Sequence, residues 1–199
     1  MSELVFQFST CNPEGFLARR IGFPFDPSEN IRRATRSAYS HVDLVMDDGG
    51  LLGASDSPRA PVVPTYPYGN PRGVAIRPGD YQQFGIRRRA YIYTDKANAI
   101  RRRAITQLGK PFDHAALRVC HMFSDSHGEG RNWRDEGQWF CAELCLWICE
   151  QEELWPFPLV VEKDRVTAND FLIYLNPLMD VARFWGETVT GERSWIGAS

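Results

Sequence analysis

One stretch of this sequence, residues 40–54, constrains the fold more than any other. Apolar and polar residues alternate from Ser40 to Met46, a DDGG turn follows, and Leu51 to Ala54 is apolar again. Alternation on both sides of a short Asp/Gly turn is typical of a β-hairpin. Because side chains alternate along a strand, one face of the first strand carries Val42, Leu44 and Met46, and the other carries His41, Asp43, Val45 and Asp47. His41 therefore leaves the apolar face.

The rest of the chain predicts further strands and helices. Strands are expected at Leu4–Phe8, Gly73–Arg77, Phe84–Tyr93 and Val181–Trp185, and helices at Lys96–Leu108, Phe140–Glu150 and from Thr167 onward. Asn30 to Ser37 is polar and is expected to be exposed. Ser55 to Gly73 holds five of the 13 prolines and predicts a long irregular loop. We therefore expect an α+β fold, with an antiparallel sheet packed against helices in a single domain over residues 1–199.

Charge and composition narrow the classes of partner. The 199 residues are 43% hydrophobic with a net charge of -2, so no overall field draws the chain to nucleic acid. Two arginine runs, Arg87–Arg89 and Arg101–Arg103, could form a phosphate-binding stripe, but a solvated strand end and a solvated helix face are the favoured interpretation. The sequence has no signal peptide pattern and no run of about 18 apolar residues. These features predict no transmembrane segment and a cytoplasmic protein, or a phage-encoded one delivered without a signal peptide.

The cysteines carry the clearest indication of chemistry. Their number, five, is odd in a chain too large to need disulfides, so at least one thiol is expected to be free. A cysteine is a nucleophile only as the thiolate, and its ordinary pKa is about 8.5. The start of a helix stabilises negative charge, and Cys141 stands at such a start in GQWFCAELC. Cys145 and Cys149 follow one turn deeper at each step and are expected to be packing residues.

A thiol nucleophile needs an imidazole that accepts its proton and returns it to the leaving group. The chain has four histidines, and His41 is the best placed, since a rigid strand holds an imidazole better than a loop does. His127 lies in a glycine-rich stretch. His114 and His121 are expected to be ordinary polar groups at a helix edge.

Four segments together resemble a known family. In order along the chain they are YSHVDLVMDDGGLLGAS, GKPFD, WFCAELCLW and VTANDFL. Their order and spacing are similar to those of permuted NlpC-like, papain-fold cysteine hydrolases, in particular the YiiX and YaeF branch, to which lecithin:retinol acyltransferase is related. The resemblance spans residues 4–172. It implies a circularly permuted papain-like fold in which the histidine strand precedes the cysteine helix.

The resemblance also implies roles for particular residues. Cys141 is the nucleophile, His41 is the general base, and GKPFD shapes the approach to the helix. The family usually has a polar residue that orients the imidazole on the strand after the histidine hairpin, and here that position falls at Gly53. Ser55, Asp56 and Asp43 are candidates to replace it, as are a backbone carbonyl and a water molecule. An inactive relative that has lost its third member is a further alternative.

The expected activity is hydrolysis of an amide bond in a peptide-like substrate, such as a cell-wall peptide, through an acyl-thioenzyme. The backbone amide of Cys141 is expected to bind the oxyanion, together with a second donor that the sequence does not identify. Trp139 could form one wall of the cleft. Two alternatives are acyl transfer to or from a lipid by the same pair, and a non-catalytic binding module that retains the cleft.

No cofactor or metal is expected. Cys120, His121, Cys141 and Cys145 could supply the ligands of a zinc site, but the adjacent Cys120–His121 pair has poor ligand spacing for zinc.

Overall fold

The structure is a computed structural model, and its described part covers most of the chain. The described residues are 1–11, 27–56, 69–81, 84–114, 137–155 and 166–180. The strand expected at Val181–Trp185 lies outside them, and so do Cys120, His121 and His127.

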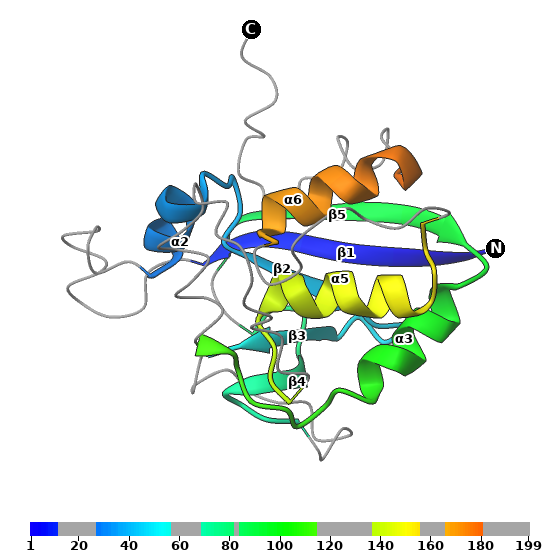
Figure 1. Ribbon diagram of the computed structural model, residues 1–199, viewed down its shortest axis with the longest axis horizontal. Coiled ribbons are helices and arrows are strands. Elements are labelled where there is room, and N and C mark those ends of the chain that lie inside the picture. The colour runs from blue at the N-terminus through cyan, green and yellow to red at the C-terminus, as the bar shows by residue number, and fades with distance from the viewer. Residues whose placement is uncertain (12–26, 57–68, 82–83, 115–136, 156–165, 181–199) are drawn as a thin grey trace, which may run out of the picture.

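Five strands form one antiparallel sheet (Figure 1). They are β1 (Ser2–Cys11), β2 (His41–Val45), β3 (Leu51–Ser55), β4 (Gly73–Arg77) and β5 (Phe84–Thr94). Their order in the sheet is β4-β3-β2-β1-β5, and each neighbouring pair is antiparallel. The β2–β3 pair is the hairpin that the alternation and the DDGG turn predict. The sheet therefore places the strand that begins with His41 at its centre.

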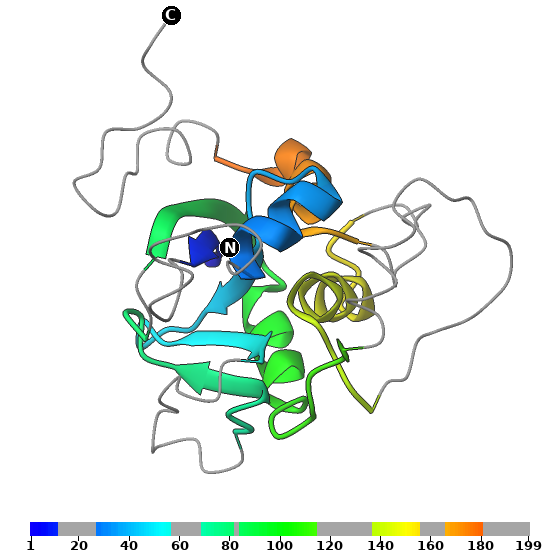
Figure 2. The same cartoon turned by 90° about the vertical axis from the view of Figure 1, so that its left-hand side faces the viewer.

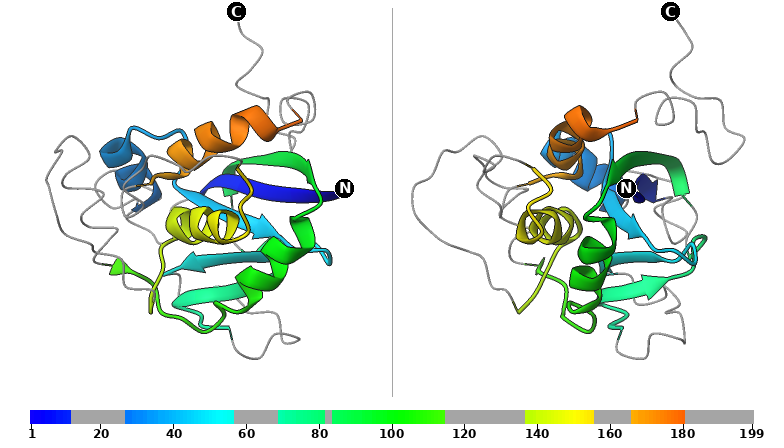
Figure 3. Two further views of the ribbon diagram at one scale, coloured as in Figure 1. Left: turned by 45° about the vertical axis from the view of Figure 1, so that its right-hand side comes forward. Right: turned by 90° about the vertical axis from the view of Figure 1, so that its right-hand side faces the viewer.

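Helices pack around this sheet in the described part of the chain. They are α2 (Pro27–Thr35), α3 (Ala97–Ile105), α5 (Cys141–Gln151) and α6 (Ala168–Leu175), followed by a 3₁₀ turn, η2 (Asn176–Leu178). Figures 1 and 3 show α3, α5 and α6 over the same face, and Figure 2 looks along α5 beside the strands. The α+β class is therefore confirmed. Within the described part of the chain, no helix is long and apolar enough to cross a membrane.

Both faces of the sheet bury apolar side chains. The main core joins Val42, Leu44 and Met46 of the β2 region to α5 and to Phe171 of α6. A second cluster on the other face comprises Val5, Val45, Leu51, Tyr81 and Tyr91. Alternating residues of β2 thus belong to different clusters, as the sequence pattern predicts. Burial on both faces fixes the register, because a shift by one residue would exchange the two sets.

Helix α2 was not predicted from the sequence. Asn30 to Ser37 is expected to be polar and exposed; in the structure Arg33 and Arg36 are exposed, Ser37 is buried, and Asn30, Ile31, Arg32 and Thr35 are half-buried. Glu29 in the first turn accepts hydrogen bonds from Arg32 at 3.1 Å and from Arg33 at 2.7 Å, the spacing that supports a helix. Each such exposed pair contributes only about 0.2–0.5 kcal/mol, so contacts with the sheet must also hold α2 in place.

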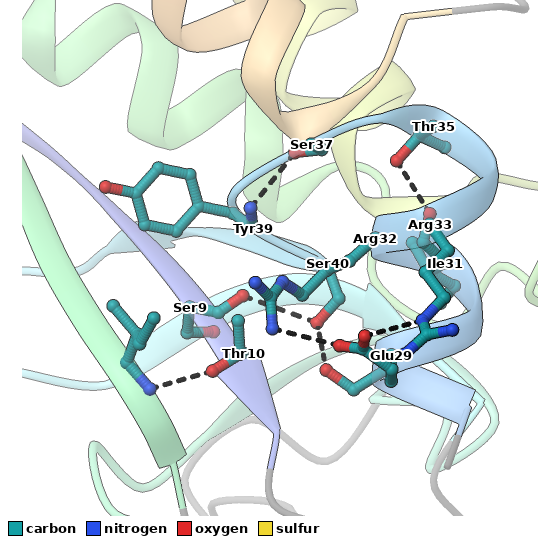
Figure 4. A network of polar contacts seen from close by, with 12 residues as sticks. Ser9, Thr10, Glu29, Ile31, Arg32, Arg33, Thr35, Ser37, Tyr39 and Ser40 are labelled. Atoms are coloured by element: carbon teal, nitrogen blue, oxygen red, sulfur yellow. Dashed lines mark hydrogen bonds and ion pairs between the residues drawn. The ribbon is translucent and has the colours of Figure 1, made fainter. Parts of the chain in front are cut away.

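Serine hydroxyls make these contacts beside the start of β2 (Figure 4). The hydroxyls of Ser28 and Ser40 lie 2.6 Å apart, and the backbone N–H of Ser40 donates to the carbonyl of Ser9 at 3.0 Å. Ser28 and Ser40 are both buried. Helix α2 is thereby attached to β1 and to the residue immediately before His41.

The two arginine runs are less exposed to solvent than expected. Arg88 is buried within β5, with 5% of its surface exposed. Arg101 is 9% exposed, donates to the carbonyl of Glu3 and pairs with Asp47 at 3.2 Å. The interpretation as solvated faces is therefore wrong for these two residues. Their burial also leaves them poorly suited to a phosphate-binding stripe.

Candidate active site

Helix α5 begins at Cys141, in the position that the sequence predicts. The preceding residue, Phe140, is extended and makes no side-chain cap hydrogen bond. Trp139 pairs with the GKPFD segment, because its N–H donates to Pro111 at 3.1 Å and its carbonyl accepts from Asp113 at 2.9 Å. The GKPFD segment thus fixes the approach of the chain to the helix.

The structure brings His41 and Cys141 together, although they stand 100 positions apart in the sequence. The thiol of Cys141 lies close enough to the imidazole of His41 to contribute to the raised pKa of that ring. Its Nε2 atom lies 2.9 Å from Oδ1 of Asp43. Since Nε2 is occupied by the carboxylate, Nδ1 is the ring nitrogen left for the thiol. In the neutral ring, Nε2–H donates to Asp43 and the Nδ1 lone pair can accept the thiol proton.

The electrostatics of this trio favour a charged imidazole. Burial by itself would lower the pKa of His41, whose side chain is largely enclosed. Attraction to Asp43 and to Cys141, together with the hydrogen bond to Asp43, outweighs burial and raises the pKa of His41 well above 6.5. These contacts therefore stabilise the imidazole ring once it has accepted a proton.

The other two cysteines of α5 have a different environment. Cys145 and Cys149 are fully buried, and burial raises the pKa of both thiols well above the ordinary value. They remain protonated and act as small apolar residues of the core, as expected from their positions deeper in the helix. Burial therefore disfavours the thiolate at Cys145 and Cys149.

Asp43, one of the candidates for the third member, contacts the imidazole. Asp43 is fully buried and makes the 2.9 Å contact with His41. Asp56 instead pairs with His114 at 3.4 Å, where both side chains are about half exposed. Ser55 stands at the end of β3. Asp43 is therefore the candidate that the geometry favours.

The position at which the resemblance expects a polar residue lies directly beside this carboxylate. A Cβ atom added to Gly53 would come within 2.0 Å of Oδ1 of Asp43. The other carboxylate oxygen, Oδ2, accepts from the hydroxyl of Tyr81 at 3.5 Å. The carboxylate is thus held between the imidazole and Tyr81, in space that a side chain at position 53 would occupy.

Sequence reasoning missed two polar neighbours on β1. In the register of β1 and β2, Ser9 lies opposite His41 and Gln7 opposite Asp43. Both are fully buried, and within the described part of the chain neither Oγ of Ser9 nor Nε2 of Gln7 has a hydrogen-bond partner. Oε1 of Gln7 accepts from Arg89 at 3.3 Å. Two polar residues in an otherwise apolar strand, LVFQFS, were the signal that could have identified them.

Trp139 has a different role from the one expected. It is fully buried, its Nε1 donates to Gln107 at 3.1 Å, and its ring lies 5.1 Å from that of Trp147. Such a residue anchors the segment before α5 in the core. The expectation that Trp139 forms a wall of the cleft is therefore wrong.

Among the residues that the structure describes, no group of three or more potential ligands could hold a metal ion. Two of the four cysteine and histidine positions weighed as a zinc site, Cys120 and His121, lie outside those residues. Comparison of the chain with protein families, curated proteins and solved structures gave no match.

Proposed function

We propose that this chain is a thiol hydrolase that cleaves an amide bond through an acyl-thioenzyme on Cys141, with His41 as the general base. One observation carries the proposal: the imidazole at the start of the central strand lies close enough to the thiol at the start of α5 to interact with it, and Asp43 contacts the same ring at 2.9 Å. A nucleophile within hydrogen-bond reach of a base, with a third group orienting the base, is the arrangement that covalent catalysis requires.

The first half of the reaction forms the acyl-enzyme. Nδ1 of His41 takes the proton of the Cys141 thiol, and the sulfur attacks the substrate carbonyl carbon. The negative charge moves to the carbonyl oxygen, near the backbone N–H of Cys141 at the start of α5. The C–N bond then breaks as the imidazolium gives its proton to the leaving amine.

The second half releases the acid. His41 takes a proton from a water molecule, whose oxygen attacks the thioester carbon. The C–S bond breaks, and the imidazolium returns a proton to the departing thiolate. The carboxylic acid leaves, and the thiol and neutral imidazole are restored.

The permuted papain-like fold is part of this proposal. An antiparallel sheet with a histidine on a strand that precedes the cysteine helix is the order that the family resemblance implies. Peptide-like substrates, including cell-wall peptides, follow from the same resemblance.

Selective alkylation tests the proposal without knowledge of the substrate. Iodoacetamide is added at pH 6 to 7 and the five cysteines are quantified by peptide mapping in the wild type and in His41→Gln. We expect Cys141 of the wild type to react at least about tenfold faster than Cys145 and Cys149, because one unit of thiol pKa corresponds to a factor of ten in thiolate. His41→Gln should remove most of this advantage.

Equal labelling of Cys141 and the other helix cysteines in the wild type would refute the proposal and favour a non-catalytic module. Selective labelling would justify a screen of peptide amides for release of the free amine.

A further inference from the structure

We propose that Asp43 is the positioning carboxylate of this site and that Gly53 makes room for it, so that the two positions act as one unit. The inference rests on the proposed function, since it concerns the group that orients the base. It assigns a role to a residue on the same strand as His41, whereas the resemblance expects that role on the next strand.

The first support is the contact itself. Oδ1 of Asp43 lies 2.9 Å from Nε2 of His41, and the carboxylate is fully buried. A hydrogen bond at Nε2 fixes both the tautomer and the orientation of an imidazole. With Nε2 on the carboxylate, Nδ1 is the ring nitrogen left to face Cys141, which interacts with the same ring.

The second support is the space beside Asp43. The register of β2 and β3 pairs Leu44 with Leu52, so the next residues, Asp43 and Gly53, lie opposite each other. A Cβ at position 53 would lie 2.0 Å from Oδ1 and 3.1 Å from Cγ of Asp43. Such separations are far shorter than van der Waals contact. A side chain at position 53 and the present position of the carboxylate therefore exclude each other.

Backbone conformation does not account for this glycine. Within the described residues, the glycines with positive φ are Gly49 and Gly109. Gly53 lies inside a regular strand with an ordinary φ, where a glycine is unfavourable for β-structure. What the glycine provides here is the absence of a side chain.

The third support lies on the far side of the carboxylate. Oδ2 of Asp43 accepts from the hydroxyl of Tyr81 at 3.5 Å, and the guanidinium of Arg77 lies over the Tyr81 ring at 5.6 Å. Arg77 is fully buried and donates to the carbonyl of Gly53 at 2.9 Å. Burial lowers the pKa of Arg77, while Tyr81 and Asp43 oppose that change. A buried cation therefore lies close enough to compensate the charge of the carboxylate.

The surroundings leave Asp43 as the main anionic partner of the imidazole besides the thiolate. The charged and titratable groups that face the pair are Cys141 and Cys145 from α5, Arg77 from β4, Tyr81 after β4, and Arg89 of β5 through Gln7 of β1. Removing the carboxylate charge should therefore lower the pKa of His41, and the Cys141 thiolate should then form at higher pH.

The experiment measures the alkylation rate of Cys141 as a function of pH in wild type, Asp43→Asn and Asp56→Asn. Asp43→Asn keeps the shape of the side chain but removes its charge, so the thiolate should form at higher pH. We expect alkylation at pH 6 to be slower by about tenfold or more, which corresponds to a shift of one unit or more in the profile. Asp56→Asn, a carboxylate near the end of β3 that pairs with His114, should follow the wild-type profile.

A double-mutant cycle tests the pairing of the two positions without reference to catalysis. Gly53→Ala should lower the urea midpoint strongly in the wild type but much less in an Asp43→Ala background, because the clashing carboxylate is then absent. Gly53→Ala should also slow Cys141 alkylation at pH 6, like Asp43→Asn. This variant keeps the inference testable if Asp43→Asn does not fold.

The outcomes separate this inference from the proposed function. If wild-type Cys141 reacts selectively but Asp43→Asn retains the wild-type profile, the role of Asp43 is refuted and the hydrolase proposal stands. Additive effects of Gly53→Ala and Asp43→Ala would refute the pairing. If wild-type Cys141 shows no selective reactivity, the proposed function itself fails.

Discussion

The two helices α5 and α6 begin in opposite ways. At α6, Thr167 and Asp170 form a complete capping box: the Thr167 hydroxyl accepts from the Asp170 N–H at 3.1 Å, and the Asp170 carboxylate accepts from the Thr167 N–H at 2.9 Å. At α5, the corresponding position holds Phe140, which makes no side-chain cap hydrogen bond. Both helices carry an acid as their third residue, and at α5 this is Glu143.

The two helix starts differ in what their backbone amides bind. A capping box satisfies backbone amides and stabilises a helix by about 1 kcal/mol. A side-chain cap at α5 would place acceptor oxygens over the amides that, in the proposed function, stabilise the Cys141 thiolate and the oxyanion. Packing replaces the missing cap, because Phe140 and the first eight residues after Cys141 are all buried. Helix α5 is thus stabilised by burial, while α6 is stabilised in part by its cap.

The largest effect should come from removing the thiol at the uncapped start. Cys141→Ala should lower amide turnover by about 10⁴-fold or more, since loss of a nucleophile typically removes most of the catalytic rate. Cys145→Ala, one turn further along the same helix, should retain turnover and lose about 1 kcal/mol of stability as a small core truncation. Release of amine from a responsive peptide substrate and urea unfolding measure the two effects. Equal turnover in the two variants would contradict the comparison.

A smaller effect should follow when α5 is given a cap. Asn and Leu have nearly the same shape, but only Asn accepts hydrogen bonds from the first turn. We therefore expect Cys141 of Phe140→Asn to be alkylated about two- to fivefold more slowly at pH 7 than Cys141 of Phe140→Leu, the range that corresponds to 0.3–1 kcal/mol of charge stabilisation by a helix start. Circular dichroism checks that both variants are folded. Identical rates would show that the uncapped amides do not act on the thiol.

Local patterns predicted much of this fold. The hairpin of β2 and β3, the buried helix at Cys141 and the cap at Thr167 each depend on residues within a few positions of one another. Helix α2 was not predicted, since its polar sequence favours exposure and its attachment depends on Ser40 and Ser9, which are distant in the sequence. The burial of Arg88 and Trp139 was also set by elements remote in the chain.

The candidate site, like the fold, could be predicted from the sequence only in part. A thiol at a helix start and an imidazole on a strand were recognisable as residue types in suitable local settings. Among Asp43, Ser55 and Asp56, however, the sequence left the choice open. The structure favours Asp43 through its contact with His41, in space that the absence of a side chain at Gly53 leaves for the carboxylate. This property of the pairing between two strands is one that neither strand shows alone.

The smallest effect on the site should come from removing the cap of α6. Thr167→Ala deletes the hydroxyl that accepts from Asp170 while leaving the charge of the chain unchanged. It should lower the free energy of unfolding by about 1 kcal/mol, the usual cost of losing such a cap. Urea unfolding measures this loss, and the Cys141 alkylation profile should remain that of the wild type, because stability and reactivity depend on different helix starts. Slower alkylation of Cys141 in Thr167→Ala would mean that α6 supports the thiol through the core that α5 and α6 share around Phe171. The two helix starts would then not act independently.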